Sequence, residues 1–453
     1  MMQDRSRPRP IRPFFGVLHR WVGLVMAAFL IVSGITGAVI SWDHELDELL
    51  NPHLLDARTE GTPRPVLELL RQVESRHPTM EVTFAPLGAE PGHSLAFWLE
   101  PKVDPKTGHL YEEKYNQVFV DPASGAELGT RKWGAVWPLS RENFVSFLYK
   151  LHYSLHFPEM FGTDHWGVWL LGVIAILWTL DCFVGFYLTL PARRRAKLTV
   201  DEALEQDDVP GASASSKSFW QRWKPSWLVR WRGGSYRVNF DLHRAAGLWA
   251  WGLLFVIAFT GFSMNLYREM FFPVMSLVSD VTPSPFDLRT PKDHDEPILP
   301  RLQFEAVIPV AHAEARRRGW EQPPGDVFYS REYGIYGVRF FHPEDGHGSG
   351  GVGHRALYYD GMDGALLGDR QPWKGTAADI FVQAQFPLHS GRIFGLPGRI
   401  LISVMGLVVA GLSITGVVIW WRKSRARLAA TRRPSLAGRD SQELAPAAGD
   451  AAE

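Results

Sequence analysis

Four long apolar blocks constrain the fold of this chain more strongly than any other feature. They lie at about 17–42, 165–190, 244–268 and 398–421. At about 20 to 25 residues each, they are long enough to cross a hydrocarbon core of about 30 Å as helices. The first block is too long for a signal-peptide core and lacks a small-residue cleavage site, so we expect it to be retained. The sequence therefore predicts an integral membrane protein with four transmembrane α-helices and sizeable soluble parts.

Basic residues mark one side of the predicted membrane. They form four clusters, namely Arg5, Arg7, Arg9 and Arg12; "PARRRAK" at 191–197; Arg230, Arg232 and Arg237; and "RKSRAR" at 422–427. Because Lys and Arg are enriched in cytoplasmic loops, we expect both termini and the loop 191–240 in the cytoplasm. Segments 43–150 and 269–385 are then expected outside.

The two outer segments resemble each other. Each has a helix-like stretch, at 65–78 and 304–319, followed by strand-like runs. Each ends in a turn of the form Asp-x-x-x-Gly, at 121–125 and 360–364, between alternating strand residues. The fold class we predict is two tandem repeats, each made of a span, an outer α+β module and a second span.

The predicted organisation follows in chain order. We expect a first helix at 14–44, a first outer module at 45–145, a second helix with an outer extension at 146–190, a cytoplasmic loop at 191–240, a third helix at 241–268, a second outer module at 269–380, a fourth helix with an outer extension at 381–422 and a disordered tail at 423–453. The stretch "GASASSKS" in the loop is typical of a linker.

Composition excludes several classes of function. The 48 basic and 48 acidic residues cancel, which argues against a nucleic-acid partner. The single cysteine, Cys182, lies inside an apolar block, so disulfides and cysteine-ligated clusters within one chain are excluded. Nucleotide-binding, Ser-His-Asp and HExxH patterns are absent from the sequence.

One phrase occurs twice, at the cytoplasmic ends of the first and third blocks. "LHRWVGL" contains His19 and Arg20, and "LHRAAGL" contains His243 and Arg244. Aligning the two blocks without a gap also matches "TG" at 36–37 with "TG" at 260–261. The repeat predicts an inner pair of histidines, His19 with His243.

The second and fourth blocks have histidines at their outer ends, in "LHYSLHF" and "LHSGR". Matching Gly162 to Gly395 pairs His156 with His389. His152 lies one helical turn before His156 on the same face, and both remain candidates for an outer pair. Residues four apart on one helix cannot be opposite ligands of one iron.

Ionisable residues at the ends of transmembrane helices are costly and mark cofactor or ion paths. For any single histidine the alternative is a hydrogen-bonded side chain at the membrane interface. Two imidazoles at each surface, with no third ligand, suit a six-coordinate haem iron better than a tetrahedral zinc. Arg20 and Arg244 are placed to meet haem propionates, or are ordinary cytoplasmic charge.

Other candidates are weaker. Asp181, inside the second block, is interpreted as an orienting group, a proton carrier or a packing hydrogen bond. The tract 342–354, "HPEDGHGSGGVGH", has the composition of a metal site, but a solvated loop is the better interpretation. His165 is expected at the interface, and His44 at the edge of an outer haem or at a helix cap.

The four apolar blocks, among them "FFGVLHRWVGLVMAAFL", "WTLDCFVGFYLTLP", "FDLHRAAGLWAWGLL" and "FPLHSGRIFGLPGRILISV", resemble the helices of PepSY-associated transmembrane proteins. The outer modules resemble PepSY domains, and the likeness covers about 14–424. The resemblance implies a bacterial inner-membrane protein with periplasmic modules, iron regulation and two b-type haems. It implies His19 and His243 for the inner haem and His389 for the outer. For the second outer ligand, "LHYSL" favours His152, whereas the repeat count favours His156.

The resemblance further implies a ferric-siderophore reductase that releases Fe(II) in the periplasm for iron uptake. Outer-sphere electron transfer requires no catalytic acid or base, and quinol or a cytoplasmic flavin reductase is the expected donor. One alternative is a haem-free membrane scaffold whose PepSY modules bind a peptidase or another periplasmic partner. A second is an electron-transfer subunit that serves another acceptor.

Overall fold

The computed structural model describes residues 11–191, 217–293 and 295–431. The chain divides into two compact units: unit 1 comprises Met1–Ala27, Val184–Trp249 and Gly411–Glu453, and unit 2 comprises Ala28–Phe183 and Ala250–Ala410. Several predicted features lie outside the described residues, namely Arg5, Arg7, Arg9, the basic run from 192 to 197, most of the predicted linker and the tail from 432.

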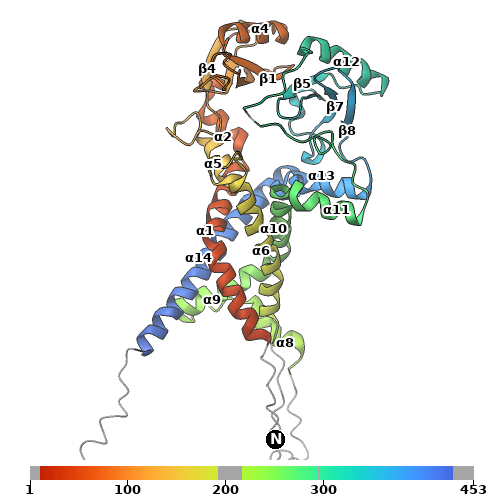
Figure 1. Ribbon diagram of the computed structural model, residues 1–453. Helices are drawn as coiled ribbons and strands as arrows, with labels where there is room; N and C mark the ends of the chain where they lie inside the picture. Colours follow the sequence, from red (N-terminus) through yellow and green to blue (C-terminus); the bar gives the residue numbers. More distant parts are fainter. Residues whose placement is uncertain (1–10, 192–216, 294, 432–453) are drawn as a thin grey trace, which may run out of the picture. The chain divides into compact units, whose positions relative to one another are not determined.

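Within the described ranges, three helices are long and apolar enough to cross a membrane. They are α1 (Ile11–Ile40), α6 (Trp166–Thr189) and α14 (Gly395–Thr431), which agree with three of the four expected spans (Figure 1). Helices α9 (Gly234–Trp249) and α10 (Trp251–Asn265) qualify only as a bent pair. The protein is therefore a membrane protein with three or four candidate spans.

The third expected span, 244–268, differs from the prediction because the helix is interrupted at Ala250. The tryptophans on either side have different partners. Trp249 donates its indole N–H to the carbonyl of Trp227 (3.2 Å), and Trp251 donates to the carbonyl of Cys182 (2.9 Å). These bonds hold the two sides of Ala250 to different segments, and the apolar pattern alone carries no sign of the interruption.

Two further boundaries are corrected in unit 1. The expected loop 191–240 contains α8 (Phe219–Trp223), η2 (Lys224–Trp227) and the start of α9. Ser218 begins α8 with a capping box that includes Gln221. The expected disordered tail from 423 is helical as far as Thr431, because α14 continues through residues of high helix propensity.

The strands of unit 2 form one antiparallel sheet with the order β4-β3-β2-β1-β5-β6-β7-β8. The strands are β1 (Met80–Pro86), β2 (Leu95–Pro101), β3 (Gln117–Val120), β4 (Glu127–Arg131), β5 (Pro324–Ser330), β6 (Ile335–Phe340), β7 (Arg355–Asp360) and β8 (Leu366–Arg370). Pairing of β1 with β5, with Phe84 opposite Phe328, joins the two halves. The two expected outer modules therefore share a single eight-stranded sheet.

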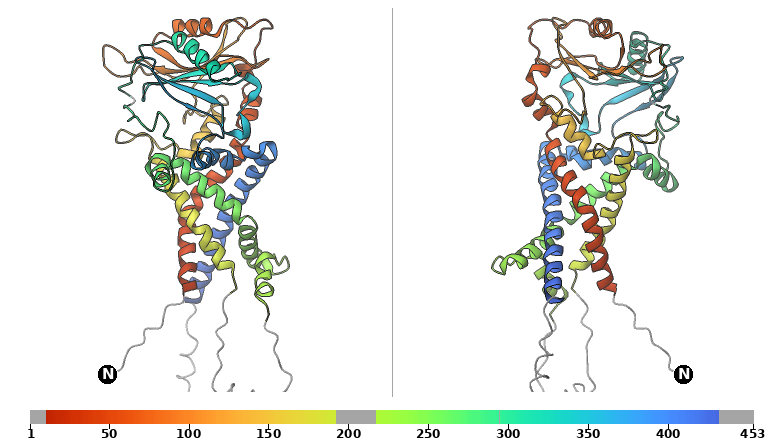
Figure 2. Two further views of the ribbon diagram at one scale, coloured as in Figure 1. Left: turned by 90° about the vertical axis from the view of Figure 1, so that its right-hand side faces the viewer. Right: turned by 60° about the vertical axis from the view of Figure 1, so that its left-hand side comes forward.

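Two amphipathic helices cover one face of this sheet, α4 (Val66–Arg76) and α12 (Phe304–Arg317) (Figure 2). Their buried residues recur every three or four positions, as in Leu69 and Val73 of α4. They pack with strand residues such as Phe97 and Val338 in one hydrophobic core. The helical stretches expected at 65–78 and 304–319 agree with these elements.

The repeated turns close the hairpins β3–β4 and β7–β8. Gly125 and Gly364 adopt the left-handed region at φ 73° and 75°, and each donates its N–H to the carbonyl of the aspartate four residues earlier. The carboxylate of Asp121 is buried, which acts to raise its pKa, but it accepts hydrogen bonds from Ser124, Arg58 and Thr59. The hydrogen bonds prevail, and the pKa of Asp121 is lowered well below its usual range.

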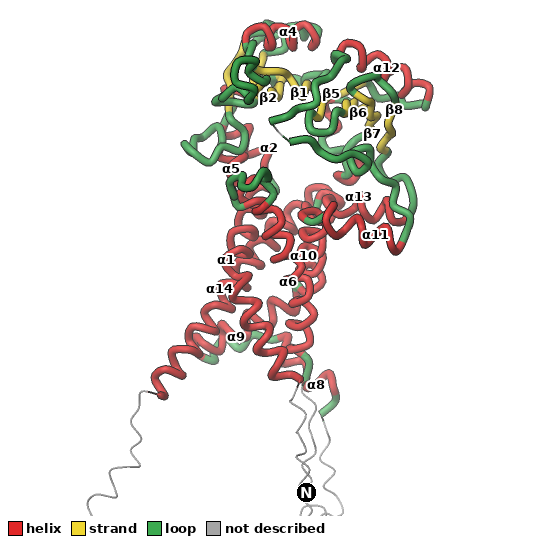
Figure 3. Tube along the Cα trace, in the orientation of Figure 1, coloured by secondary structure: helices red, strands yellow, loops and turns green. Residues whose placement is uncertain are grey.

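Short helices connect the sheet to the apolar helices within unit 2 (Figure 3). They are α2 (Asp43–Leu50), α3 (Pro52–Leu55), α5 (Phe144–Ser154), η3 (Tyr267–Phe271), α11 (Phe272–Val278), α13 (Ala377–Ser390) and η6 (Arg392–Phe394). Two further short helices, η4 (Pro343–Asp345) and η5 (Ser349–Gly351), lie in the connection between β6 and β7. Thr376 and Asp379 form a capping box at the start of α13. Asp379 also accepts hydrogen bonds from Thr282, which fixes this helix in place.

Candidate functional site

His152 on α5 and His389 on α13 face each other in unit 2, with ring centres 6.1 Å apart and ring planes 60° apart. We call them the outer pair. The helices that carry them are separated by more than 200 residues of sequence, which include strands β5 to β8. The fold therefore brings together two of the three outer histidines that the sequence singled out.

The orientation of His152 is fixed by α1. Its Nδ1 lies 3.0 Å from the carbonyl oxygen of Ser33 and 3.1 Å from Oγ1 of Thr36. A carbonyl oxygen only accepts, so Nδ1 carries the proton and Nε2 keeps its lone pair. A neutral imidazole with a free Nε2 is a metal ligand whose tautomer is set by its second nitrogen.

His389 is held in the same way by α10. Its Nδ1 lies 2.9 Å from Oγ1 of Thr260, and that hydroxyl already donates its proton to the carbonyl of Val256 (2.7 Å). The hydroxyl oxygen therefore accepts from Nδ1, and Nε2 of His389 is again left with its lone pair. Both rings of the outer pair present the same kind of nitrogen.

Glycines follow both of these threonines, and each lies against an imidazole. A Cβ atom added to Gly37 would lie 2.8 Å from Cε1 of His152, and one added to Gly261 would lie 3.5 Å from Cε1 of His389. The first distance is too short for any side chain without displacement of the ring, whereas the second is ordinary contact. Gly37 is therefore required for the observed position of His152.

A cavity of about 660 Å³ lies at the outer pair. Its walls include apolar side chains of several helices, such as Leu30, Ile174 and Ile257. Arg268 and Arg392 also line it. This size and lining are typical of a site for an apolar cofactor that has a few charged groups.

The separation of the rings tests whether a haem fits. Two imidazoles on opposite sides of one metal ion, each with a bond of about 2.0 Å and a ring centre about 1.1 Å behind the nitrogen, have ring centres about 6.2 Å apart. The outer pair is separated by 6.1 Å. The free Nε2 atoms, the ring separation and the apolar cavity together fit a bis-imidazole haem.

His156 lies apart from this pair. Its Nε2 is 2.8 Å from the carbonyl oxygen of Phe147, and its ring is stacked on that of Phe147 with centres 4.5 Å apart. His156 follows the end of α5 and adopts a left-handed backbone conformation, with φ 54°. The alignment that matched Gly162 to Gly395 paired His156, which lies in a loop, with His389, which lies in a helix. The structure places His152, not His156, opposite His389.

His19 on α1 and His243 on α9 form an inner pair in unit 1, with ring centres 6.2 Å apart. Nδ1 of His243 lies 3.0 Å from the carbonyl oxygen of Leu412 and 3.0 Å from Oγ1 of Thr415. Gly416 follows this threonine, and an added Cβ would lie 3.2 Å from Cε1 of His243. The inner pair therefore has nearly the same ring separation as the outer pair, and His243 has the same kind of support as His152.

Three threonine–glycine steps thus support three histidines: Thr36–Gly37, Thr260–Gly261 and Thr415–Gly416. The sequence comparison matched the first two as part of the internal repeat, but it assigned the threonines no role and did not include the third. The signal that identifies all three is a "TG" step in the interior of an apolar block. In α6, Gly185 lies next to His19, at 3.6 Å from an added Cβ to Cε1, but Val184 precedes it.

The arginines beside the inner pair meet another condition for a haem. Among the described residues, Nε of Arg20 and Nε of Arg244 are buried and have no hydrogen-bond partner. The guanidinium of Arg244 also donates to the carbonyl of Pro225 (2.6 Å) and to Asp241 (3.0 Å). Buried N–H donors without an acceptor suit a bound carboxylate, which haem propionates would supply.

The weaker candidates are arranged differently. Asp181 is buried in α6, and the ring of His165 is stacked on Trp169. The ring of His354 is stacked on that of Phe341. Over the ranges that the structure covers, no group of three or more His, Cys, Asp or Glu residues has the arrangement of a metal site.

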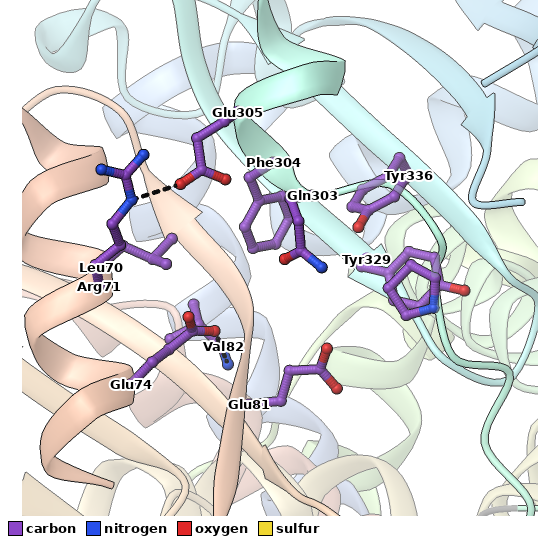
Figure 4. Close-up of a pocket in the computed structure, with 11 residues that line it drawn as sticks. Leu70, Arg71, Glu74, Glu81, Val82, Gln303, Phe304, Glu305, Tyr329 and Tyr336 are labelled. Carbon is purple, nitrogen blue, oxygen red and sulfur yellow. Dashed lines mark hydrogen bonds and ion pairs between the residues drawn. The ribbon is translucent and has the colours of Figure 1, made fainter. Parts of the chain in front are cut away.

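A second cavity, of about 390 Å³, lies on the helical face of the sheet. Figure 4 shows that α4 contributes Glu74 and α12 contributes Glu305 to its lining. Nε of Arg71 donates to Glu305 across it (2.9 Å). Burial raises the pKa of Glu74, and its carboxylate accepts the N–H of Val82 at 3.4 Å.

Comparison with protein families identifies the family of this chain. A family model described as the PepSY-associated TM region matches residues 17–423, close to the range 14–424 that the resemblance suggested. Comparison with curated proteins gives no match.

Proposed function

Because the chain belongs to the PepSY-associated TM region family, we propose that it is a di-haem membrane reductase. In this proposal one haem b is held by His19 and His243, and a second by His152 and His389. Electrons pass to a ferric siderophore on the outer side of the bacterial inner membrane, and iron is released as Fe(II). The substrate and the electron path are inferences from the family resemblance and the histidine pairs.

The observation that carries the proposal is the matched geometry of the two pairs. Their ring centres are 6.1 and 6.2 Å apart, close to the separation of about 6.2 Å expected for two trans imidazoles on one ion. The pairs come from different helices and lie in different units. A packing role for interfacial histidines does not require the same separation twice.

When bound, haem supplies reversible one-electron transfer. The chain supplies the rest. The four histidines would hold the two haems, and Thr36, Thr260 and Thr415 help to set the tautomers of three of them. Apolar side chains such as Leu30 and Ile174 would contact the ring of the outer haem. No side chain needs to transfer a proton, so we propose no catalytic acid or base.

The distribution of basic residues supports the proposed side of the membrane for each pair. Arg422 and Lys423 on α14 belong to the basic clusters expected on the cytoplasmic side. His19 and His243 lie close to two of these clusters in the sequence. The donor is therefore proposed to act on that side, as quinol or a cytoplasmic flavin reductase. The outer pair would hold the haem nearer to the siderophore.

Reduction with dithionite followed by reoxidation tests this function in the purified full-length protein. We expect a b-type spectrum, rapid reoxidation by a ferric siderophore, and Fe(II) trapped by a chromogenic chelator. The gallium complex of the same siderophore is the matched control, because Ga(III) is not reduced under these conditions. A haem spectrum without reoxidation would point to another electron acceptor, and absence of haem would favour the scaffold function.

A further inference from the structure

A third pair of histidines lies in unit 2, beyond the end of the candidate span α1. His44 is the second residue of α2, and His347 lies in the loop between η4 and η5. Their Nε2 atoms are 3.3 Å apart, and their ring centres are 5.0 Å apart. Both side chains are exposed. The pair joins residues separated by 303 positions in the sequence.

The two rings lie closer together than those of the haem candidates, whose ring centres are 6.1 and 6.2 Å apart. Two metal–nitrogen bonds of about 2.0–2.1 Å at a tetrahedral angle of about 109° place the nitrogens about 3.3–3.4 Å apart. The observed Nε2–Nε2 distance is 3.3 Å. His44 and His347 are therefore spaced as neighbouring ligands of one small ion, whereas trans ligands would be about 4 Å apart.

A hydrogen bond between the two imidazoles explains this contact less well. Hydrogen bonds from ring nitrogens have their most frequent length near about 2.9–3.0 Å, and exposed imidazoles can use water instead. The position of His347 is also specified by the chain, since Gly346 and Gly348 on either side adopt φ values of 56° and 71°. This backbone, which other residues rarely adopt, directs the ring of His347 to His44.

The charged side chains around the two histidines form ion pairs. Two arginines lie near His347, but each is paired with a carboxylate. Arg392 contacts Asp43 at 3.2 Å, and Arg399 contacts Glu45 at 2.7 Å. The cluster around the two histidines is close to neutral, so the imidazoles decide which ligand binds.

We propose that His44 and His347 bind a divalent transition-metal ion that prefers imidazole ligands, such as Zn²⁺ or Cu²⁺, with water in the remaining positions. The bound ion links the loop that carries His347 to α2, directly after α1. The site is independent of haem and of the proposed reductase activity. Two protein ligands and exposure to water imply a weaker, exchangeable site in contrast to a buried structural zinc.

The test is calorimetric titration of Zn²⁺ into the full-length, detergent-purified protein, with any affinity tag removed. We expect one saturable site per chain. His44→Gln and His347→Gln should each weaken binding by at least about tenfold, because each removes one of two protein ligands. His109→Ala is the matched control, because His109 is also exposed and should leave binding unchanged.

Copper provides a second readout that a folding defect cannot imitate. With one equivalent of Cu²⁺, we expect electron paramagnetic resonance to show hyperfine splitting from two nitrogen nuclei, reduced to one in either single variant. Circular dichroism should show that the variants remain folded. Unchanged Zn²⁺ affinity in the double variant, or absence of a saturable site in the wild-type protein, would overturn the proposal.

Discussion

Oγ1 of Thr36 lies 3.1 Å from Nδ1 of His152, although 116 residues separate them in the sequence. The same relationship joins Thr260 to His389 and Thr415 to His243. In each case the hydroxyl of a threonine within an apolar helix accepts a hydrogen bond from Nδ1–H. Together with the carbonyls of Ser33 and Leu412, these threonines set the tautomers of the three histidines.

Replacing Thr36 with valine should weaken the binding of the outer haem by about tenfold, because the imidazole of His152 loses one of its two hydrogen-bond acceptors. The carbonyl of Ser33 remains, so the loss is expected to be partial. Haem content per chain, measured after washing in detergent, checks the prediction. Thr36→Ser retains the hydroxyl and should restore the content; an equal loss in both variants would contradict this role.

Two glycine substitutions form a matched pair. Gly37→Ala places a Cβ 2.8 Å from the ring of His152, whereas Gly261→Ala places one 3.5 Å from the ring of His389. Overpacking of this kind costs about 1–3 kcal/mol, or about 5- to 150-fold in haem affinity. We expect Gly37→Ala to lose the outer haem and Gly261→Ala to retain it. Equal retention would show that the ring position is not critical.

His152→Ala and His156→Ala separate the two histidines that the sequence left open. The first should reduce the haem content from two per chain to one, because it removes an axial ligand. The second should leave both haems in place and cost about 1 kcal/mol of stability through the lost bond to Phe147. Haem quantitation and thermal unfolding measure the two effects, and the reverse result would reassign the ligand.

The buried carboxyl of Glu74 leads us to expect that the stability of the sheet in unit 2 depends on pH. Burial raises the pKa of its carboxyl in the folded state, so its contribution to stability is full below the unfolded pKa of about 4.3 and is lost as pH rises through the folded pKa. Glu74→Gln stays neutral and keeps an acceptor for Val82. We expect its thermal midpoint to exceed that of wild type by about 1–2 °C at pH 7.5.

The same comparison at pH 4 provides the control for Glu74. The carboxyl of Glu74 is then mostly protonated, and the difference between the two midpoints should largely vanish. A difference that persists at pH 4 would indicate a packing effect of the substitution instead of ionisation.

The sequence predicted α1, α6 and α14 well, because a long apolar run is a direct property of the chain. It predicted neither the interruption at Ala250 nor the pairing of β1 with β5. The interruption depends on the separate partners of Trp249 and Trp251, and the pairing depends on which strand edges meet. Neither is encoded in local periodicity.

The candidate site was predicted in the same uneven way. Repetition in the sequence identified His19, His243 and His389. For the fourth histidine, the match of Gly162 to Gly395 selected His156 in place of His152. The segments that follow His152 and His389 differ in length and turn conformation, so an anchor glycine beyond them shifted the match. The supporting carbonyl of Ser33 has no sequence signal, because any residue supplies a carbonyl.

The number of haems bound per chain tests the central claim most directly. Pyridine haemochrome analysis of the purified protein should give two haems for wild type, one for His243→Ala, one for His389→Ala and none for the double variant. A wild-type protein without haem, or single variants that both retain two haems, would contradict the account.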